Sequence, residues 1–200
     1  MLADIATEAG SYSLLEAAAV VLAIGYLLLV IRQNIWCWLC AVISTACYVY
    51  IFIDAKLYME SALNLFYLVV AVYGWRVWLK GGQGNTELPV SKWPLHRHAA
   101  AMAVVLVLAA GTGFTLERYS DAVYPYLDSL TTFAAIWATF LVARKVLENW
   151  WYWIAIDAVS VAIYWSRDLP LTALLFVVYL VLIPFGLIQW TRSWRAQAAQ

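Results

Sequence analysis

Residues 99–116 read AAAMAVVLVLAAGTGFTL, eighteen consecutive positions without one charged side chain. A helix of this length rises about 27 Å, close to the roughly 30 Å of a bilayer's hydrocarbon core. The run therefore predicts a transmembrane helix. A strand is excluded, because membrane-barrel strands are only about ten residues long and alternate in polarity.

The rest of the chain has the same character. Of its 200 residues, 66% are hydrophobic and 12% are charged, with a mean hydropathy of +0.79, whereas soluble domains are about a quarter charged. Basic and acidic residues number 12 each, so no nucleic-acid partner is expected. We predict an all-α integral membrane protein with seven transmembrane helices. They cover residues 14–31, 35–53, 61–78, 99–116, 124–143, 150–165 and 171–190.

The distribution of basic residues predicts the orientation. With the N-terminus outside, nine of the 12 lysines and arginines fall on the inner side and three on the outer side. Because cytoplasmic loops carry the excess of basic residues, we expect a periplasmic N-terminus and a cytoplasmic C-terminus. No cleaved signal peptide is expected, since Asp4 and Glu8 stand where such a peptide has basic residues. His96 and His98 fall in the inner loop, where we expect solvated side chains.

The chain also matches itself at an offset of 112 residues. Matched pairs include Glu16 with Asp128, Arg32 with Arg144, Trp38 with Trp150, Gly74 with Gly186, and Trp78 with Trp190. These matches predict a duplication of the first three helices in the last three.

Helix 99–116 has no counterpart in this alignment. One linking helix leaves both halves pointing the same way through the membrane, so we predict a 3+1+3 parallel repeat. This plan is associated with carriers that hold their substrate near the membrane midplane. The predicted parts are a first repeat, a cytoplasmic loop with the linking helix, and a second repeat with a cytoplasmic tail, at residues 1–78, 79–123 and 124–200.

The most informative pattern lies in residues 150–165, WWYWIAIDAVSVAIYW. Spacings of three and four place Trp150, Trp153, Asp157, Ser160 and Tyr164 on one helical face. A carboxylate in lipid costs several kcal/mol, so Asp157 must face a polar cavity, a partner or a substrate. Because indole faces attract cations, we predict a cation site here. An interfacial belt for Trp150 and a structural pair for Asp157 are the alternatives.

The first repeat offers a second polar face. Asn64 both donates and accepts hydrogen bonds, and Tyr67 shares its face, although contact between helices is an alternative role for Asn64. Small hydroxyl residues in helix 35–53, with Thr45 in register with Asp157, are either substrate contacts or packing residues. The candidate substrate residues of this repeat are Ser44, Thr45, Tyr48, Asn64 and Tyr67.

Four further polar residues are assigned gating or structural roles. Glu60 lies at the outer boundary, and Asn149 directly precedes Trp150 as a cap or an inner gate. Glu16 and Asp128 are equivalent acids near the outer ends of their helices, where pairing, capping and substrate contact are all open.

Motifs for catalysis are missing from the sequence. It contains no nucleophile elbow, no phosphate loop and no H-E-x-x-H, so neither an enzyme nor an ATP-driven pump is expected. Cys37 and Cys40 form a C-x-x-C, but they lie in an apolar run without a histidine cluster, which favours packing over a metal or redox site. No cofactor is expected. A receptor, a scaffold and an ion-coupled carrier remain alternatives.

Two motifs resemble the PnuC family of bacterial vitamin transporters. They are the Tyr73-Gly74-Trp75 element and the N-W-x-x-W element formed by Asn149, Trp150 and Trp153. The resemblance implies a 3+1+3 fold similar to the SWEET sugar transporters, a homotrimer in the bacterial inner membrane, and facilitated diffusion of nicotinamide riboside. It also implies a cytoplasmic kinase that traps the vitamin as a charged product.

Two positions depart from the family pattern. Typical riboside carriers have Gln where this chain has Asn64, and Asn where it has Asp157. Relatives in the family take thiamine or riboflavin. Nicotinamide riboside and thiamine both carry a fixed positive charge that Asp157 could offset, so thiamine is the alternative substrate, while neutral riboflavin is disfavoured.

Overall fold

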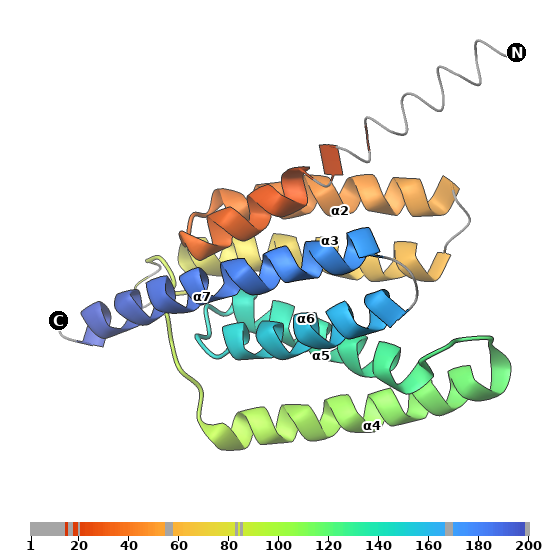
Figure 1. The fold of residues 1–200 in the computed structure, drawn as a ribbon. Helices are drawn as coiled ribbons and strands as arrows, with labels where there is room; N and C mark the ends of the chain where they lie inside the picture. The colour runs from red at the N-terminus through yellow and green to blue at the C-terminus, as the bar shows by residue number, and fades with distance from the viewer. Residues whose placement is uncertain are drawn as a thin grey trace, which may run out of the picture. The chain divides into compact units, whose positions relative to one another are not determined.

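The computed structural model describes residues 15, 18–19, 21–54, 58–82, 84, 86–166 and 170–198. The regular structure of these residues is helical (Figure 1), and their only β-pairing is one isolated parallel bridge between Ser91 and Val146. This confirms the predicted all-α class. The helical stretch Val21–Ile31 is followed by α2 (Trp36–Asp54), α3 (Tyr58–Lys80), α4 (Leu95–Tyr119), α5 (Pro125–Ala143), α6 (Asn149–Ser166) and α7 (Pro170–Ala198).

Two helices run further than their apolar cores predict. The helix predicted at 99–116 extends by about one turn at each end, from the residue after Pro94 to the residue before Ser120. The last helix continues past residue 190 to Ala198. Polar residues extend these helices beyond the apolar segment, so an apolar run predicts the part inside lipid and not the helix ends.

Three described helices are long and apolar enough to cross a membrane. They are Leu95–Tyr119, Pro125–Ala143 and Ala173–Gln197. Val21–Ile31 and Trp36–Ile51 are apolar but shorter. α6 is not among the three, because its tryptophans, tyrosines and Asp157 lower the mean hydropathy of an otherwise aliphatic helix.

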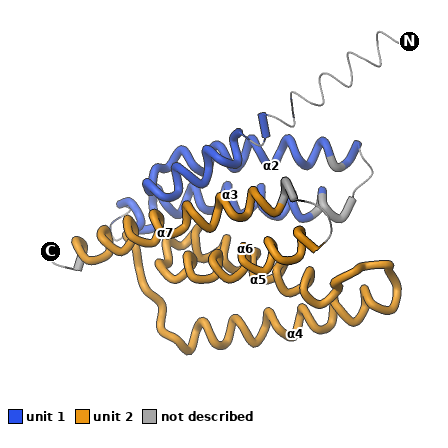
Figure 2. The backbone as a smooth tube through the Cα atoms, viewed as in Figure 1, with its two compact units in different colours: residues 1–88 blue, residues 89–200 orange. Residues whose placement is uncertain are grey.

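The chain forms two compact units, Met1–Leu88 and Pro89–Gln200, shown in different colours in Figure 2. Within unit 1, α2 packs against α3. Within unit 2, α4 packs against α5, α5 against α6, and α6 against α7. The boundary falls in the segment between α3 and α4.

The core of unit 1 is built around Trp38. Its ring is 1% exposed and meets the Trp78 ring edge to face, with centroids 5.4 Å apart at 88°. Gly74 lies against the same ring, where any Cβ would overlap the indole. Glycine is needed here because helices in lipid associate through close packing rather than through a hydrophobic driving force.

Unit 2 contains the same arrangement, 112 residues later. Trp150 is 1% exposed, meets Trp190 edge to face with centroids 5.4 Å apart at 89°, and excludes a Cβ at Gly186. The turns before α2 and α6 also match, since Gln33 has φ 54° and Lys145 has φ 47°. Left-handed backbone is uncommon for residues other than glycine, so its recurrence at equivalent positions marks a shared turn geometry.

A second contact layer of unit 2 joins α4, α5 and α6. Val105, Ala134, Ala138 and Ile156 form a buried cluster, against which larger side chains pack. Small residues at the centre let these helices approach closely. This layer places one side of α6 against α4 and α5, while Trp150 faces α7.

Candidate functional site

Asp157 lies near the middle of α6 and is the central residue of the candidate site. Its side chain is 3% exposed. Among the residues that the structure describes, none makes a hydrogen bond or an ion pair with this carboxylate. A charged side chain at the centre of a membrane helix costs roughly 2.5–3.5 kcal/mol, so a fold that retains one without a partner favours a role for it in ligand binding.

Trp153 lies one helical turn before Asp157. Its half-buried ring packs against the buried cluster of α4, α5 and α6. The cluster holds one side of the indole, which fixes the ring while leaving part of its surface accessible. A fixed and partly accessible indole is suited to contact with a flat or cationic ring.

Trp150 begins the same stripe but points to a different neighbour. Its ring is enclosed by Gly186 and Trp190 of α7. Its indole Nε1 is buried and has no hydrogen-bond partner within the described residues. Trp150 therefore has a packing role between α6 and α7, whatever else it contacts.

The remaining stripe residues follow α6 toward its C-terminal end. Ser160 is buried, and the Tyr164 ring stacks on Phe176 of α7 with centroids 5.3 Å apart at 9°. We refer to Trp150, Trp153, Asp157, Ser160 and Tyr164 together as the α6 stripe. Its two ends pack on α7, and Asp157 stands between them.

Asn149 is the first residue of α6 and is fully buried. Its side-chain Nδ2 donates a hydrogen bond to the Val146 carbonyl at 2.7 Å. Its Oδ1 is buried and finds no hydrogen-bond partner in the described part of the chain. The side chain thus stabilises the turn that precedes α6, while its Oδ1 stays able to accept a hydrogen bond.

Two hydroxyls among the unit 1 candidates are already engaged in structural hydrogen bonds. Ser44 is buried and donates to the Ala19 carbonyl at 2.9 Å, which ties α2 to the preceding helix. Thr45 donates to the Ala41 carbonyl of its own helix at 2.7 Å. The other three candidates of unit 1 are half-buried; they are Tyr48, Asn64 and Tyr67.

Of the four residues assigned gating or structural roles, Asn149 and Asp128 have described side chains. Asp128 is half-buried in the first turn of α5, where a carboxylate interacts favourably with the helix dipole. Glu16 and the side chain of Glu60 lie outside the described residues. The candidates of unit 1 and the α6 stripe belong to different compact units.

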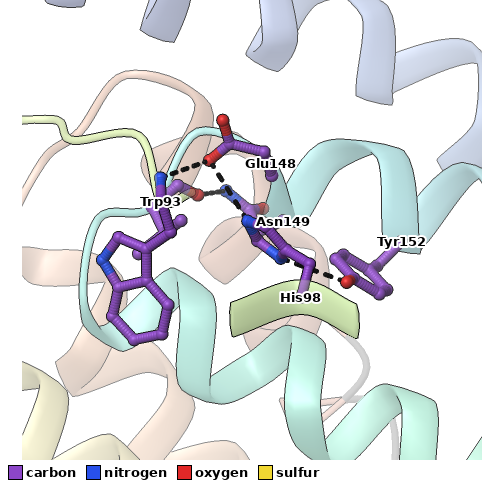
Figure 3. A network of polar contacts seen from close by, with 6 residues as sticks. Trp93, His98, Glu148, Asn149 and Tyr152 are labelled. Atoms are coloured by element: carbon purple, nitrogen blue, oxygen red, sulfur yellow. Dashed lines mark hydrogen bonds and ion pairs between the residues drawn. The ribbon is translucent and has the colours of Figure 1, made fainter. Parts of the chain in front are cut away.

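His98 corrects one expectation. His96 is exposed as expected, but His98 is buried at 8% exposure. Its Nδ1 is hydrogen-bonded to the Tyr152 hydroxyl at 3.1 Å, and its Nε2 lies 3.9 Å from Glu148 Oε2 (Figure 3). The same carboxylate oxygen accepts a hydrogen bond from the Trp93 backbone N–H at 3.3 Å.

The spacing of residues along α4 held a signal for this burial. The buried residues of α4 are His98, Val105, Ala109 and Gly113, which lie seven, four and four residues apart. His98 therefore extends the buried face of α4 by two turns toward its N-terminus. The extent of α4 beyond its apolar segment was the missing information.

Comparison with known proteins gives consistent matches over nearly the whole chain. Residues 13–192 match the family model described as nicotinamide mononucleotide transporter. The chain is 23% identical over 227 residues to the nicotinamide riboside transporter PnuC of Escherichia coli (strain K12), covering 100% of this chain and 95% of that relative. It is 29% identical over 208 residues to the nicotinamide riboside transporter PnuC of Neisseria mucosa, covering 94% of this chain and 76% of the relative.

A solved structure and a more distant relative complete the comparison. A crystal structure of the vitamin B3 transporter PnuC matches with a TM-score of 0.70 at 25% identity, covering 92% of this chain and 83% of that chain. The riboflavin/roseoflavin transporter RibM of Streptomyces davaonensis is 23% identical over 128 residues, covering 62% of this chain and 59% of that relative. All these relatives are transporters, which confirms the expectations of a membrane transporter and of a protein that is not an enzyme.

Proposed function

Because the chain belongs to the nicotinamide mononucleotide transporter family, we propose that it imports a cationic vitamin, nicotinamide riboside, across the bacterial inner membrane. The two PnuC relatives described above, whose matches cover 100% and 94% of this chain, are nicotinamide riboside transporters. The residues that we assign to substrate binding are the α6 stripe, with Trp153 and Asp157 at its centre, together with Asn64, Tyr67, Ser44, Thr45 and Tyr48 in unit 1.

One observation supports a cationic substrate above all others. Asp157 is 3% exposed and has no partner among the described residues. The pyridinium ring of nicotinamide riboside brings a fixed positive charge that offsets this carboxylate when bound. Trp153, one turn away, presents an aromatic surface to the same ring.

Substrate charge also separates this proposal from the riboflavin carriers of the family. Riboflavin is neutral and would bury Asp157 without a countercharge, which costs free energy. The likeness to the riboflavin/roseoflavin transporter covers only 62% of this chain. We therefore assign this chain to the carriers of cationic vitamins.

Thiamine is the second candidate, because its thiazolium ring carries the same fixed charge. Asn64 is shorter than the Gln of typical riboside carriers, which leaves room for a different ring beside α3. Asn64 and Asp157 would then be the positions that determine specificity.

Transport follows the concentration gradient in this proposal. The sequence holds no phosphate loop for ATP, and a facilitator needs no energy source if its product is removed. A cytoplasmic kinase that phosphorylates the vitamin would trap it, because the charged phosphate ester does not return through the carrier.

The proposed architecture is a 3+1+3 parallel repeat with a periplasmic N-terminus, a cytoplasmic C-terminus and a homotrimeric assembly in the lipid bilayer. Its parts are residues 1–78, 79–123 and 124–200. Support for the repeat comes from the Trp38–Gly74–Trp78 and Trp150–Gly186–Trp190 constellations, which share ring distances, ring angles and an offset of 112. In this scheme Asn149 serves the inner gate, Glu60 the outer mouth, and Glu16 and Asp128 equivalent structural roles.

Uptake by proteoliposomes tests the function directly. Purified protein reconstituted into liposomes should equilibrate labelled nicotinamide riboside faster than empty liposomes, without ATP and without dependence on imposed proton or sodium gradients. Thiamine and riboflavin serve as competitors. Absence of flux for both cationic vitamins would point to a receptor or a scaffold, whereas a response to the gradients would point to an ion-coupled carrier.

A further inference from the structure

The segment that leads into α4 is fastened to the start of α6. The Ser91 backbone N–H donates to the Lys145 carbonyl at 3.0 Å, and the Leu147 N–H donates to the Ser91 carbonyl at 2.8 Å. Contacts of neighbouring residues add to this attachment. We call the four residues whose contacts complete it the clasp: Trp93, His98, Glu148 and Tyr152 (Figure 3).

The two hydrogen bonds of the clasp fit one tautomer of His98. An ionised Glu148 carboxylate only accepts, and it already receives the Trp93 N–H. In the tautomer with the proton on His98 Nε2, Nδ1 accepts a hydrogen bond from the Tyr152 hydroxyl at 3.1 Å. Nε2 then faces Glu148 Oε2 from 3.9 Å, which is beyond hydrogen-bond distance, and it has no hydrogen-bond partner among the described residues. His98 thereby joins α4 to α6 through one hydrogen bond, to Tyr152, and lies beside Glu148, the residue directly before α6.

Aromatic contacts enclose the clasp. The Trp93 ring lies beside His98, Trp137 and Phe140, with centroids 6.5, 6.0 and 6.2 Å apart. The Tyr152 ring packs against the buried cluster of α4, α5 and α6. Shielded hydrogen bonds are stronger than exposed ones, so this location favours a persistent attachment.

The clasp and Asp157 occupy different sides of α6, and Trp153 lies between them around the helix. At 100° per residue, Glu148 and Tyr152 share a face of α6, while Trp153 is turned by about 100° and Asp157 by about 140° from Tyr152. A helix held on one face presents its other face at a fixed angle.

We propose that the clasp is a positioning device that sets the rotation of α6 about its axis, and with it the direction in which Trp153 and Asp157 face the substrate. Glu148 precedes Asn149, and Tyr152 precedes Trp153, so each of these two clasp residues is next to a residue of the N-W-x-x-W element. Binding sites lose affinity when the residues that hold their contact side chains are loosened. This inference rests on the proposed function only for its second readout.

The decisive variant is Tyr152→Phe, which removes the hydroxyl and keeps the ring. Its matched control is Tyr126→Phe, because the Tyr126 hydroxyl donates to Glu117 Oε2 at 2.7 Å near the start of α5, the opposite end of that helix from Trp137 and Phe140. Each variant removes one tyrosine hydroxyl and, with it, one hydrogen bond within unit 2. His98→Asn keeps a hydrogen-bond acceptor, the amide Oδ1, near the position of Nδ1 and should keep the hydrogen bond from the Tyr152 hydroxyl, whereas His98→Ala should lose it.

The first readout is hydrogen exchange of the amides of residues 147–153, which needs no ligand. Tyr152→Phe and His98→Ala should accelerate exchange there by about fivefold, the effect of losing one net hydrogen bond, while Tyr126→Phe and His98→Asn should leave it within about twofold of wild type. Equal exchange in wild type, Tyr152→Phe and His98→Ala would overturn the proposal.

The second readout is the affinity for nicotinamide riboside. We expect Tyr152→Phe to weaken binding about fivefold, as loss of one hydrogen bond would, without change in oligomeric state or thermal stability beyond that of Tyr126→Phe. Faster exchange with unchanged affinity would show a merely structural clasp and reject the positioning role. Should wild type bind no vitamin, the proposed function fails, and the exchange data still decide whether the clasp holds α6.

Discussion

The α2–α3 pair of unit 1 and the α6–α7 pair of unit 2 share one framework but differ in polarity. Each pair has a tryptophan wedged on a glycine and an edge-to-face partner ring 5.4 Å away. Each is preceded by a turn residue with positive φ. The shared features are those that close packing in lipid requires.

The two pairs differ in the polar residues that α6 carries and α2 lacks. Counting 112 residues along the chain, Thr45 corresponds to Asp157, and its hydroxyl is bonded to its own helix whereas Asp157 has no partner in the described part of the chain. At the start of α6, polar residues replace apolar or weakly polar side chains of α2: the clasp residues Glu148 and Tyr152 correspond to Trp36 and Cys40, and Asn149 corresponds to Cys37. Packing has thus been kept in both pairs, while the polar groups suited to binding are concentrated in one.

Substitution of the two packing glycines should have the largest effect. A Cβ at Gly74 or Gly186 would overlap a buried indole, so Gly74→Ala and Gly186→Ala should each destabilise the protein by about 3 kcal/mol, the upper end for overpacking. Thermal unfolding in detergent measures this. Gly111→Ala on α4 is the control, because nothing lies within 4 Å of its added Cβ, and it should be neutral or slightly stabilising. A large loss of thermal stability in only one of the two glycine variants would contradict the equivalence of the two helix pairs.

Neutralising Asp157 should separate binding from stability. Asp157→Asn should weaken a cationic vitamin by about 2 kcal/mol, the size of a charge-assisted contact, and should raise the thermal stability because a buried unpaired charge is removed. Thr45→Val, at the equivalent position of α2, should change affinity much less. Calorimetry and thermal unfolding on the same preparations check both effects. Unchanged affinity in a folded Asp157→Asn variant would remove Asp157 from the site.

Substitution of two tryptophans tests whether the aromatic contribution to substrate affinity also comes from unit 2. Trp153→Ala should weaken substrate binding about tenfold through loss of aromatic contact, whereas Trp36→Ala should have little effect, because Trp36 is 56% exposed and contacts the Trp75 ring. Equilibrium binding measures both. Equal losses would show that the α6 stripe is not the binding face.

The turn residues should show the smallest effect. Glycine tolerates positive φ without strain, so Gln33→Gly should stabilise the protein by about 0.5 kcal/mol after the entropy of the unfolded chain is counted. Lys145→Gly should gain less, because the Lys145 side chain is buried whereas that of Gln33 is half-buried, so more packing is lost at Lys145. The melting temperatures of the two variants decide between these expectations. Destabilisation by Gln33→Gly would show that its side chain, and not its backbone, maintains the turn.

Three features could be predicted from the sequence. Long apolar runs predict the helices, the 112-residue offset predicts the equivalent residues, and the place of Asp157 within an apolar run predicts a buried acid. The hydrogen bonds of Ser44 and Thr45 could not be predicted, since a hydroxyl in a helix bonds backbone carbonyls or a ligand with the same sequence pattern. The clasp was missed for a different reason. His98 lies in a polar segment before the apolar run, and only the three-dimensional structure shows that α4 extends through it and brings His98 to Tyr152.

The central claim is that Asp157 selects the vitamin by its positive charge. The most direct test compares the affinity of nicotinamide riboside with that of its reduced dihydro form, which has nearly the same shape but a neutral ring, in wild type and in Asp157→Asn. We expect wild type to prefer the cation by at least about tenfold, the size of one charge-assisted contact, and Asp157→Asn to lose most of that preference. The same preference in both proteins would contradict the assignment of Asp157 as the countercharge.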